Sequence, residues 1–253
     1  MRFASLGSGS KGNATLIEWR DTLVMVDCGF SIKETTLRMA KLAKQPQDLS
    51  AILVTHEHSD HWKGVMPLAN KFGIKVYLTA GCLKSRDLKN PTTDFRIIDS
   101  HTEFQVGDLT VTPVPVPHDA REPVQYLFNS LNHKLGVLTD IGSLTPHVEA
   151  QYDNCHGLLL EANHDLDMLA MGPYPAFLKD RVSGQWGHLN NQQTARLLAN
   201  VDQSLIQQLV IGHISDKNNS LEKVRVAVEE VYTGQGSLHY ACQQEGFDWL
   251  ELI

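Results

Sequence analysis

Residues 50–61 read SAILVTHEHSDH, an apolar run followed at once by a loop rich in ionisable side chains. Three histidines and one aspartate, His56, His58, Asp60 and His61, fall within six residues of this loop. On an extended or turning backbone His56 and His58 point the same way, while Asp60 and His61 can turn toward an adjacent point. Imidazole and carboxylate groups suit Zn, Fe or Mn rather than thiolate-type copper sites. The loop therefore predicts a site for two divalent cations.

Three more ligand-type residues follow apolar runs later in the chain. His118 closes VTPVPVPH, Asp140 closes LGVLTD and His213 closes LVIGH. Each would lie where a predicted strand ends, and so at one rim of the sheets, with Asp140 as the natural bridging carboxylate. The ligand-type residues expected to converge are His56, His58, Asp60, His61, His118, Asp140 and His213.

The composition is that of an ordinary globular protein, with 42% hydrophobic and 20% charged residues in a chain of 253. Because no linker or repeat interrupts it, we expect a single domain over residues 1–253. No apolar run approaches the roughly 18–20 residues of a membrane-spanning helix, and the first residues lack the apolar core of a secretory signal. We therefore expect a soluble, cytoplasmic protein that makes no membrane contact.

The charge and the cysteines narrow the chemistry further. With 22 basic and 29 acidic residues the net charge is -7, which lowers the expectation of binding long nucleic acid without excluding it. That objection would weaken if one groove collected the basic residues Lys11, Lys33, Arg86, Lys179 and Arg181. The four cysteines are scattered without a CxxC pair, so we expect reduced thiols rather than disulfides or zinc ligands.

A glycine-rich segment resembles a dinucleotide-binding motif but lacks its context. Residues 7–12 read GSGSKG after a predicted strand, and a dinucleotide site requires a helix to begin there. The following residues 13–29, NATLIEWRDTLVMVDCG, alternate as strands do. The segment therefore predicts a turn between two strands, although its backbone N–H groups could still face an anion.

Hairpin signals recur along the chain and helical patterns become frequent in its second half. The pairs 14–18 with 22–26, 104–106 with 109–116, and 124–129 with 134–139 each flank a short turn. The segments Ser237–Cys242 and Trp249–Leu252 are expected to form a last hairpin. Many hairpins with helices outside them indicate an α/β protein whose sheets pack face to face under helical layers.

The pattern Thr-His-x-His-x-Asp-His after an apolar strand, with the later His, Asp and His, resembles the metallo-β-lactamase superfamily over nearly the whole chain. Asp27 in VMVDCG matches that superfamily's first conserved Asp, which supports the metal loop rather than binding metal. The resemblance implies a four-layer αββα sandwich with the site at one edge.

Later motifs are similar to those of the YycJ/WalJ-like group and, in the same order, of ribonuclease Z. They are EANHD at 161–165, GHL at 187–189, and HIS at 213–215 with the pair Asn218-Asn219. Asn190 stands where a serine would be expected, which puts a hydroxyl contact there in doubt. The sequence shows no long inserted arm for holding tRNA, so tRNA 3′ processing is not expected.

The resemblance implies two divalent cations, with Zn first and Mn or Fe as alternatives. One cation would be bound by His56, His58, His118 and Asp140, and the other by Asp60, His61, Asp140 and His213. Two cations about 3.5–4 Å apart can hold and polarise a bridging water. The resulting hydroxide would be the nucleophile, attacking phosphorus in line while the cations neutralise the phosphate oxygens.

Resemblance to ribonuclease Z makes His188 the proton donor to the leaving group and a phosphate clamp, with Glu161 orienting it or raising its pKa. The alternative, that His188 caps the next helix, is weaker because Asn190 is the better N-cap. We count Asp60, Glu161 and His188 as catalytic. Substrate contacts are expected from Ser8, Asn13, His164, His188 and Asn219, although His164 could equally be a plain loop residue.

The resemblance thus implies a dinuclear metal-dependent phosphodiester hydrolase, a DNA exonuclease whose partner is nucleic acid. The alternative is a hydrolase of a small phosphodiester, such as a cyclic nucleotide, or of a thioester or lactone. A metal-binding scaffold without turnover is a third possibility, which a complete ligand set disfavours. His188 and Glu161 favour a phosphate leaving group over a thioester. A homodimer is expected only by analogy with the family.

Overall fold

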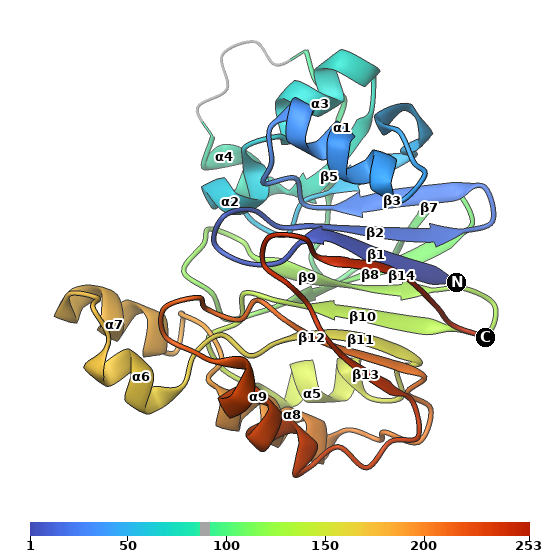
Figure 1. Cartoon of the computed structure of the whole chain (residues 1–253). Coiled ribbons are helices and arrows are strands. Elements are labelled where there is room, and N and C mark those ends of the chain that lie inside the picture. Colours follow the sequence, from blue (N-terminus) through green and yellow to red (C-terminus); the bar gives the residue numbers. More distant parts are fainter. Residues whose placement is uncertain (87–91) are drawn as a thin grey trace.

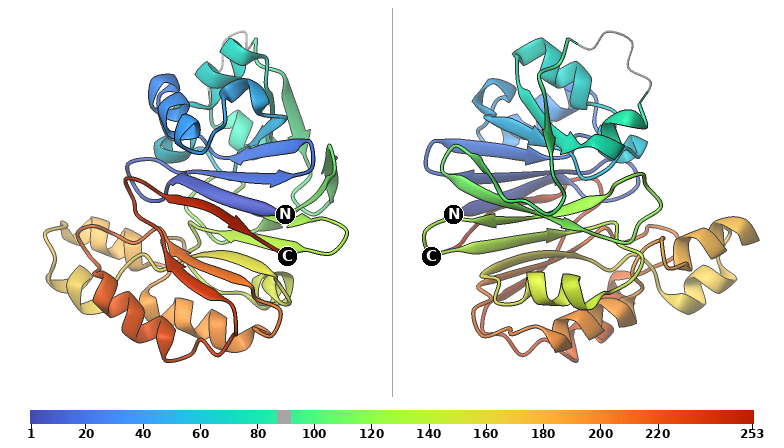
Figure 2. Two further views of the ribbon diagram at one scale, coloured as in Figure 1. Left: turned by 45° about the vertical axis from the view of Figure 1, so that its right-hand side comes forward. Right: turned by 180° about the vertical axis from the view of Figure 1, so that it is seen from behind.

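The computed structural model of the protein describes residues 1–86 and 92–253, and contains two seven-stranded sheets that lie face to face (Figures 1 and 2). Helices cover the outer face of each sheet, so the layers run helix, sheet, sheet, helix. This arrangement confirms the predicted αββα sandwich. No helix in the described ranges combines the length and the apolar character needed to cross a membrane.

The first sheet is mixed, and its strands come from the first hundred residues plus the end of the chain. In spatial order they are β14 (Phe247–Glu251), β1 (Arg2–Gly7), β2 (Ala14–Trp19), β3 (Thr22–Val26), β4 (Ala51–Leu53), β5 (Lys75–Thr79) and β6 (Phe95–Ile98). The glycine-rich segment joins the antiparallel strands β1 and β2, so the predicted turn is confirmed and a dinucleotide fold is excluded.

The second sheet is also mixed, with parallel pairing from β10 to β13. Its strands in spatial order are β13 (Ser237–Tyr240), β12 (Gln208–Gly212), β11 (Gly157–Glu161), β10 (Lys134–Leu138), β9 (Val124–Asn129), β8 (Leu109–Pro115) and β7 (Phe104–Val106). The three internal hairpins predicted from the sequence are present as β2–β3, β7–β8 and β9–β10.

The helices divide between the two sheets, apart from one projecting pair. The first sheet carries α1 (Ile32–Lys41), the 3-10 turn η1 (Pro46–Asp48), α2 (Ser59–Trp62), α3 (Val65–Phe72) and α4 (Ala80–Lys84). The second sheet carries α5 (Pro146–Tyr152), α8 (Asn191–Asn200) and α9 (Leu221–Glu229), while α6 (Leu166–Met171) and α7 (Ala176–Ser183) extend beyond it (Figure 1).

Alternate residues of the central strands pack into different layers. On β3, Val24 and Val26 face the core between the sheets, whereas Leu23 and Met25 face the helices of the first sheet. On β11, Leu159 joins the core between the sheets while its neighbours face the helices of the second. Both faces of these strands are buried, which explains why they read as continuous apolar runs.

The predicted C-terminal hairpin is wrong. Strand β13 pairs in parallel with β12 in the second sheet, and β14 pairs antiparallel with β1 in the first. Between them a single bridge joins Cys242 to Gly246. Pairing β14 with β1 packs Phe247 and Leu250 against the core between the sheets, a gain that strand periodicity alone could not reveal.

The loop that bears the histidine-rich motif rests on backbone from the first sheet. Asn13 N donates to Asp60 O over 2.8 Å, and Cys28 N donates to His61 O over 2.8 Å. A Cβ on Gly29 would lie 1.8 Å from the same Asp60 oxygen, a contact with backbone that no rotamer change relieves. Glycine is therefore required where this loop crosses the strand end.

Gly29→Ala should lower the free energy of unfolding by about 3 kcal/mol, the upper end for overpacking, and should weaken cation binding. The comparison variant is Gly73→Ala, because Gly73 has φ +69 but open space around its Cβ and should cost about 1–2 kcal/mol without affecting cations. Urea denaturation and calorimetric cation titration measure both effects. Equal effects of the two variants on cation affinity would contradict this account.

Candidate active site

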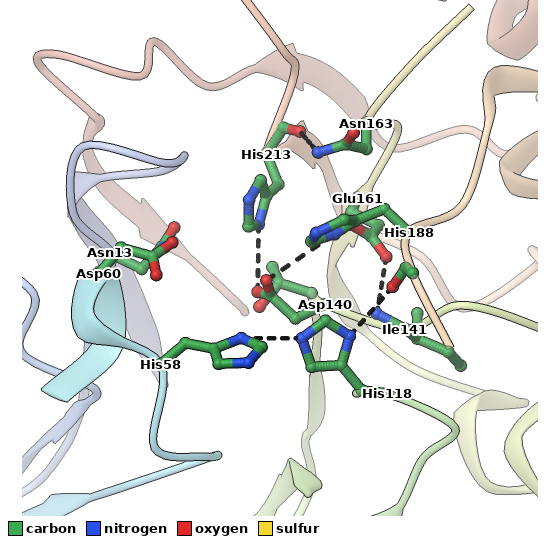
Figure 3. A network of polar contacts seen from close by, with 12 residues as sticks. Asn13, His58, Asp60, His118, Asp140, Ile141, Glu161, Asn163, His188 and His213 are labelled. Carbon is green, nitrogen blue, oxygen red and sulfur yellow. Dashed lines mark hydrogen bonds and ion pairs between the residues drawn. The ribbon is translucent and has the colours of Figure 1, made fainter. Parts of the chain in front are cut away.

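Strand ends bring the predicted ligands to one edge of the sandwich. His56, His58 and Asp60 follow β4, while Asp140 and His213 follow β10 and β12. Figure 3 shows Asp140 at the centre, with His58, His118, His188 and His213 around it. Asp27, Asp140 and His213 have φ of 59, 55 and 53°. Such left-handed backbone at non-glycine residues costs energy and is common at functional sites.

Three imidazoles form the first ligand-type group. His58 Nδ1 lies 3.0 Å from His56 Nε2 and 3.3 Å from His118 Nε2, and one nitrogen of each ring falls within 4.8 Å of the others. The opposite nitrogens have partners elsewhere: His56 Nδ1 is 2.9 Å from Thr55 Oγ1, and His118 Nδ1 donates to Gly187 O over 3.0 Å. The inward Nε2 atoms of His56 and His118 therefore present lone pairs on the side that faces His58.

A second group surrounds the Asp140 carboxylate. Asp140 Oδ2 lies 3.3 Å from His61 Nε2 and 3.1 Å from His213 Nδ1, and Asp60 Oδ2 lies 3.6 Å from His61 Nε2. Asp140 Oδ2 and His213 Nδ1 are buried and make no hydrogen bond among the described residues. Buried polar atoms without hydrogen bonds are costly unless a ligand satisfies them, so this donor set fits a divalent cation.

Burial and charge give three of the ligand-type residues, His56, His118 and Asp140, the protonation that metal binding needs. Burial lowers the pKa of His56 well below its usual value and that of His118 to about 4, so both rings are neutral at neutral pH. Burial opposes ionisation of Asp140, but the His213 and His61 rings outweigh it and hold its pKa well below the usual range. Neutral imidazole and ionised carboxylate are the forms that bind metal.

Asp27 lies beneath the histidine-rich loop and is not among the residues that line the cavity over the site. Its carboxylate accepts from Thr55 N at 2.8 Å, Thr55 Oγ1 at 2.7 Å and His61 Nδ1 at 2.8 Å. Burial raises the pKa of Asp27, while these donors and His61 favour the charged form. By holding the proton on His61 Nδ1, the carboxylate leaves Nε2 facing Asp140. This is the supporting position that the resemblance gives to Asp27.

His188 and Glu161 form a polar pair beside the ligand groups. His188 Nδ1 is 3.1 Å from Glu161 Oε2, and Glu161 Oε1 accepts from Ile141 N at 2.8 Å and Leu189 N at 3.2 Å. Burial disfavours the charged ring, but the Glu161 carboxylate outweighs it and, with Asp140 and Asp60, raises the pKa of His188 to about 9. His188 also comes within ligand range of Asp140 and His213.

A cavity of about 360 Å³ opens over these residues. Of the predicted site residues, those in its lining are His58, Asp60, Asp140, His188 and His213. The lining also contains residues without a predicted role, Asp119 and Tyr174 among them. Asp119 follows His118 directly, the one sequence signal that could have indicated it.

Four predicted substrate contacts point inward instead. Ser8 Oγ accepts from His213 N at 2.9 Å, and Asn13 Nδ2 lies 2.9 Å from His61 Nε2. Asn219 bonds Asn191 and Ala162 O, and His164 is fully buried with both ring nitrogens unbonded among the described residues. None of these four residues, all within the described ranges, lines the cavity, so direct substrate contact finds no support in their placement.

The structure also tests the predicted helix cap and the predicted groove of basic residues. Asn190 accepts from Gln193 N as the N-cap of α8 within a capping box, so His188 is not the helix cap. Of the basic residues proposed to line one groove, Arg181 lines this cavity. Lys11 instead pairs with Asp216 and Lys179 donates to Ala170 O, and neither lysine lines the cavity.

Comparison with known proteins agrees with this geometry. Residues 22–214 match the family described as the beta-lactamase superfamily domain. The chain is 34% identical to exodeoxyribonuclease YycJ of Bacillus anthracis, covering 93% of this chain and 90% of that protein. It is 33% identical to exodeoxyribonuclease WalJ of Streptococcus pneumoniae, covering 87% of this chain and 84% of that protein.

Solved structures share the fold at much lower identity. The metallo-β-lactamase fold protein YhfI of Bacillus subtilis superposes with a TM-score of 0.75 at 15% identity, covering 99% of both chains. The short form of human tRNase Z gives 0.68 at 16% identity over 100% of both. The family match spans residues 22–214, and the YycJ and WalJ proteins are 33–34% identical to this chain over most of its length. The chain therefore belongs to the metallo-β-lactamase superfamily.

Proposed function

We propose that the protein is a metal-dependent phosphodiester hydrolase that acts as a DNA exonuclease. The observation that carries this proposal is the run of ligand-type groups that overlap at His56 and at Asp140, beside the His188–Glu161 pair. The exodeoxyribonuclease names of the YycJ and WalJ relatives support the choice of DNA.

The residues fit two divalent cations, with Zn first and Mn or Fe as alternatives. His56, His58, His118 and Asp140 would bind one cation, and Asp60, His61, Asp140 and His213 the other. Cations bound there would supply positive charge for the phosphate oxygens and the acidity that turns water into a nucleophile at neutral pH. The buried, unbonded Asp140 Oδ2 is the atom that most needs such a partner.

The chain's own contribution to bond cleavage is a proton. With its pKa near 9, the His188 ring is protonated at neutral pH, and it lines the cavity. Glu161 accepts from the ring through Oε2 and from two backbone N–H groups through Oε1. The ring is therefore fixed in orientation, able to bind a phosphate oxygen and to protonate the leaving alkoxide.

A small phosphodiester is the second candidate substrate. The cavity volume of about 360 Å³ is near the lower end of ordinary ligand pockets, roughly 300–1,000 Å³. A cyclic or mononucleotide diester would fit such a space. Cytoplasmic location, a single domain and a homodimer remain predictions.

With Mn or Zn, the protein should release nucleotides progressively from 5′-phosphorylated double-stranded DNA, and His58→Ala should abolish release because it removes a ligand from the first group. The exposed His101→Ala serves as the control. If DNA is not cleaved while bis-p-nitrophenyl phosphate is, the substrate is a small diester. Retention of full activity and full metal content by His58→Ala would refute the metal assignment.

His188→Ala should slow DNA hydrolysis by about 10²–10⁴-fold, the usual contribution of a proton donor, without reducing metal content. His147→Ala, exposed on α5, is the matched control. Activity that needs protonated His188 should fall as pH rises through its pKa of about 9. Glu161→Gln removes the charge that raises this pKa, so the fall should move to lower pH; an unchanged pH profile would contradict the assignment.

Asp27→Asn should weaken cation affinity by about 10–100-fold, as expected when the partner that orients a ligating histidine is altered. Isothermal titration with Zn or Mn measures the change, and thermal unfolding checks that the fold persists. Asp21→Asn, at an exposed turn, should leave the affinity unchanged. Equal affinities for the Asp27 and Asp21 variants would show that Asp27 does not orient His61.

A further inference from the structure

Helix α7 forms one wall of the cavity while standing largely apart from the sandwich. No residue of Ala176–Ser183 is buried, and the helix projects beyond the second sheet together with α6 (Figures 1 and 2). Tyr174, Leu178 and Val182 all line the cavity and recur every four residues, which places Leu178 and Val182 on one helix face. This wall therefore presents a mainly apolar surface to whatever occupies the cavity.

One cation projects from the same wall. Among the described lining residues, Arg181 is the single Lys or Arg, whereas Asp60, Asp119 and Asp140 supply three carboxylates. Arg181 Nε donates to Asp119 Oδ2, and Asp119 Oδ1 lies 3.5 Å from His58 Nε2. The Asp119 carboxylate thus lies between the Arg181 guanidinium and the first imidazole group.

The guanidinium has hydrogen-bonding capacity to spare. Arginine carries five N–H donors in a planar fork, and within the described ranges Nε makes the only hydrogen bond of the Arg181 side chain. The side chain is 55% exposed. A phosphate has the geometry that such a fork binds through two parallel hydrogen bonds, so the free terminal nitrogens suit an incoming phosphate oxygen pair.

The wall is also in contact with the segment that carries the proton donor. His188 N donates to Val182 O over 2.9 Å, and a Cβ on Gly187 would lie 2.3 Å from Arg181 O. Because backbone touches backbone here, the helix turn bearing Arg181 keeps a fixed position relative to His188. A phosphate bound by Arg181 would therefore be held at a fixed distance from a phosphate bound by His188.

We propose that α7 and Tyr174 just before it bind the terminal nucleotide of the DNA strand being cleaved, with Arg181 on the phosphodiester next to the scissile one and the Tyr174 and Leu178 side chains against the base or sugar. The proposal rests on the proposed nuclease function and names its substrate class. A cavity of about 360 Å³ holds about one nucleotide rather than a duplex. Stacking on an aromatic ring is indifferent to base identity, which suits an exonuclease.

The test compares Arg181→Ala, Arg181→Lys and the control Lys179→Ala, whose side chain bonds Ala170 O on the same arm and does not line the cavity. Kinetics are measured on single-stranded DNA and on bis-p-nitrophenyl phosphate, which lacks a neighbouring phosphate. Binding is measured by anisotropy with a fluorescein-labelled phosphorothioate oligodeoxynucleotide, single-stranded or in a blunt duplex.

Arg181→Ala should raise KM for single-stranded DNA about 10- to 100-fold, the loss of a charged hydrogen-bonded contact. This increase should be at least about tenfold greater than that for the small diester. Arg181→Lys should recover part of the loss, and Lys179→Ala should match the wild type. The slope of log Kd against log salt should fall by about one for Arg181→Ala.

Equal losses on both substrates would place Arg181 at the scissile phosphate or at the metal ligands and overturn the proposal. Equal weakening by the Arg181 and Lys179 variants would reduce the effect to general charge and overturn it as well. If the wild type hydrolyses neither of these substrates nor 5′-phosphorylated double-stranded DNA, the proposed function fails. Binding of the labelled strand would then decide the α7 site independently, through its dependence on Arg181.

Discussion

The hydrogen bonds to the Asp27 carboxylate hold together the part of the structure on which everything else at the site depends. Two of them come from Thr55 and one from His61, so a single buried group at the end of β3 fixes both ends of the histidine-rich loop. Because His61 Nδ1 is engaged below the loop, its Nε2 must face Asp140. A buried carboxylate is tolerable here because three hydrogen-bond donors satisfy it.

The acidic character of the cavity and the anionic substrate are compatible once charge is counted locally. Asp60, Asp119 and Asp140 would repel a polyanion, and Arg181 alone does not balance them. Divalent cations bound by the ligand groups would add positive charge to this small region while the rest of the surface stays acidic. A protein of net charge -7 can thus attract phosphate at one place and resist nonspecific adsorption of nucleic acid elsewhere.

The convergence of the ligand-type residues could be predicted from the sequence, because each of them follows an apolar run. The ends of strands that run in the same direction meet at one edge of a sheet. His118, Asp140 and His213 could be placed on that rule without knowing strand order. Side-chain direction in loops obeys no such rule, so Ser8, Asn13, His164 and Asn219 were expected to contact substrate when their side chains are buried. Arg181 could not be singled out, because its role depends on where α7 projects. The pairing of β13 with β12 and of β14 with β1 likewise could not be predicted, because it depended on which strands had an unpaired edge.

The pairing of β14 with β1 has a consequence for how the chain is made. Arg2 pairs with Glu251, so strand β1 lacks its outer neighbour until β14, about 240 residues later in the sequence, has left the ribosome. Until then β1 is an open sheet edge with unpaired N–H and C=O groups, a template on which nascent chains can associate. Contacts between such distant residues also form slowly. The edge of β1 is therefore protected from such association only once β14 has been synthesised and has paired with it.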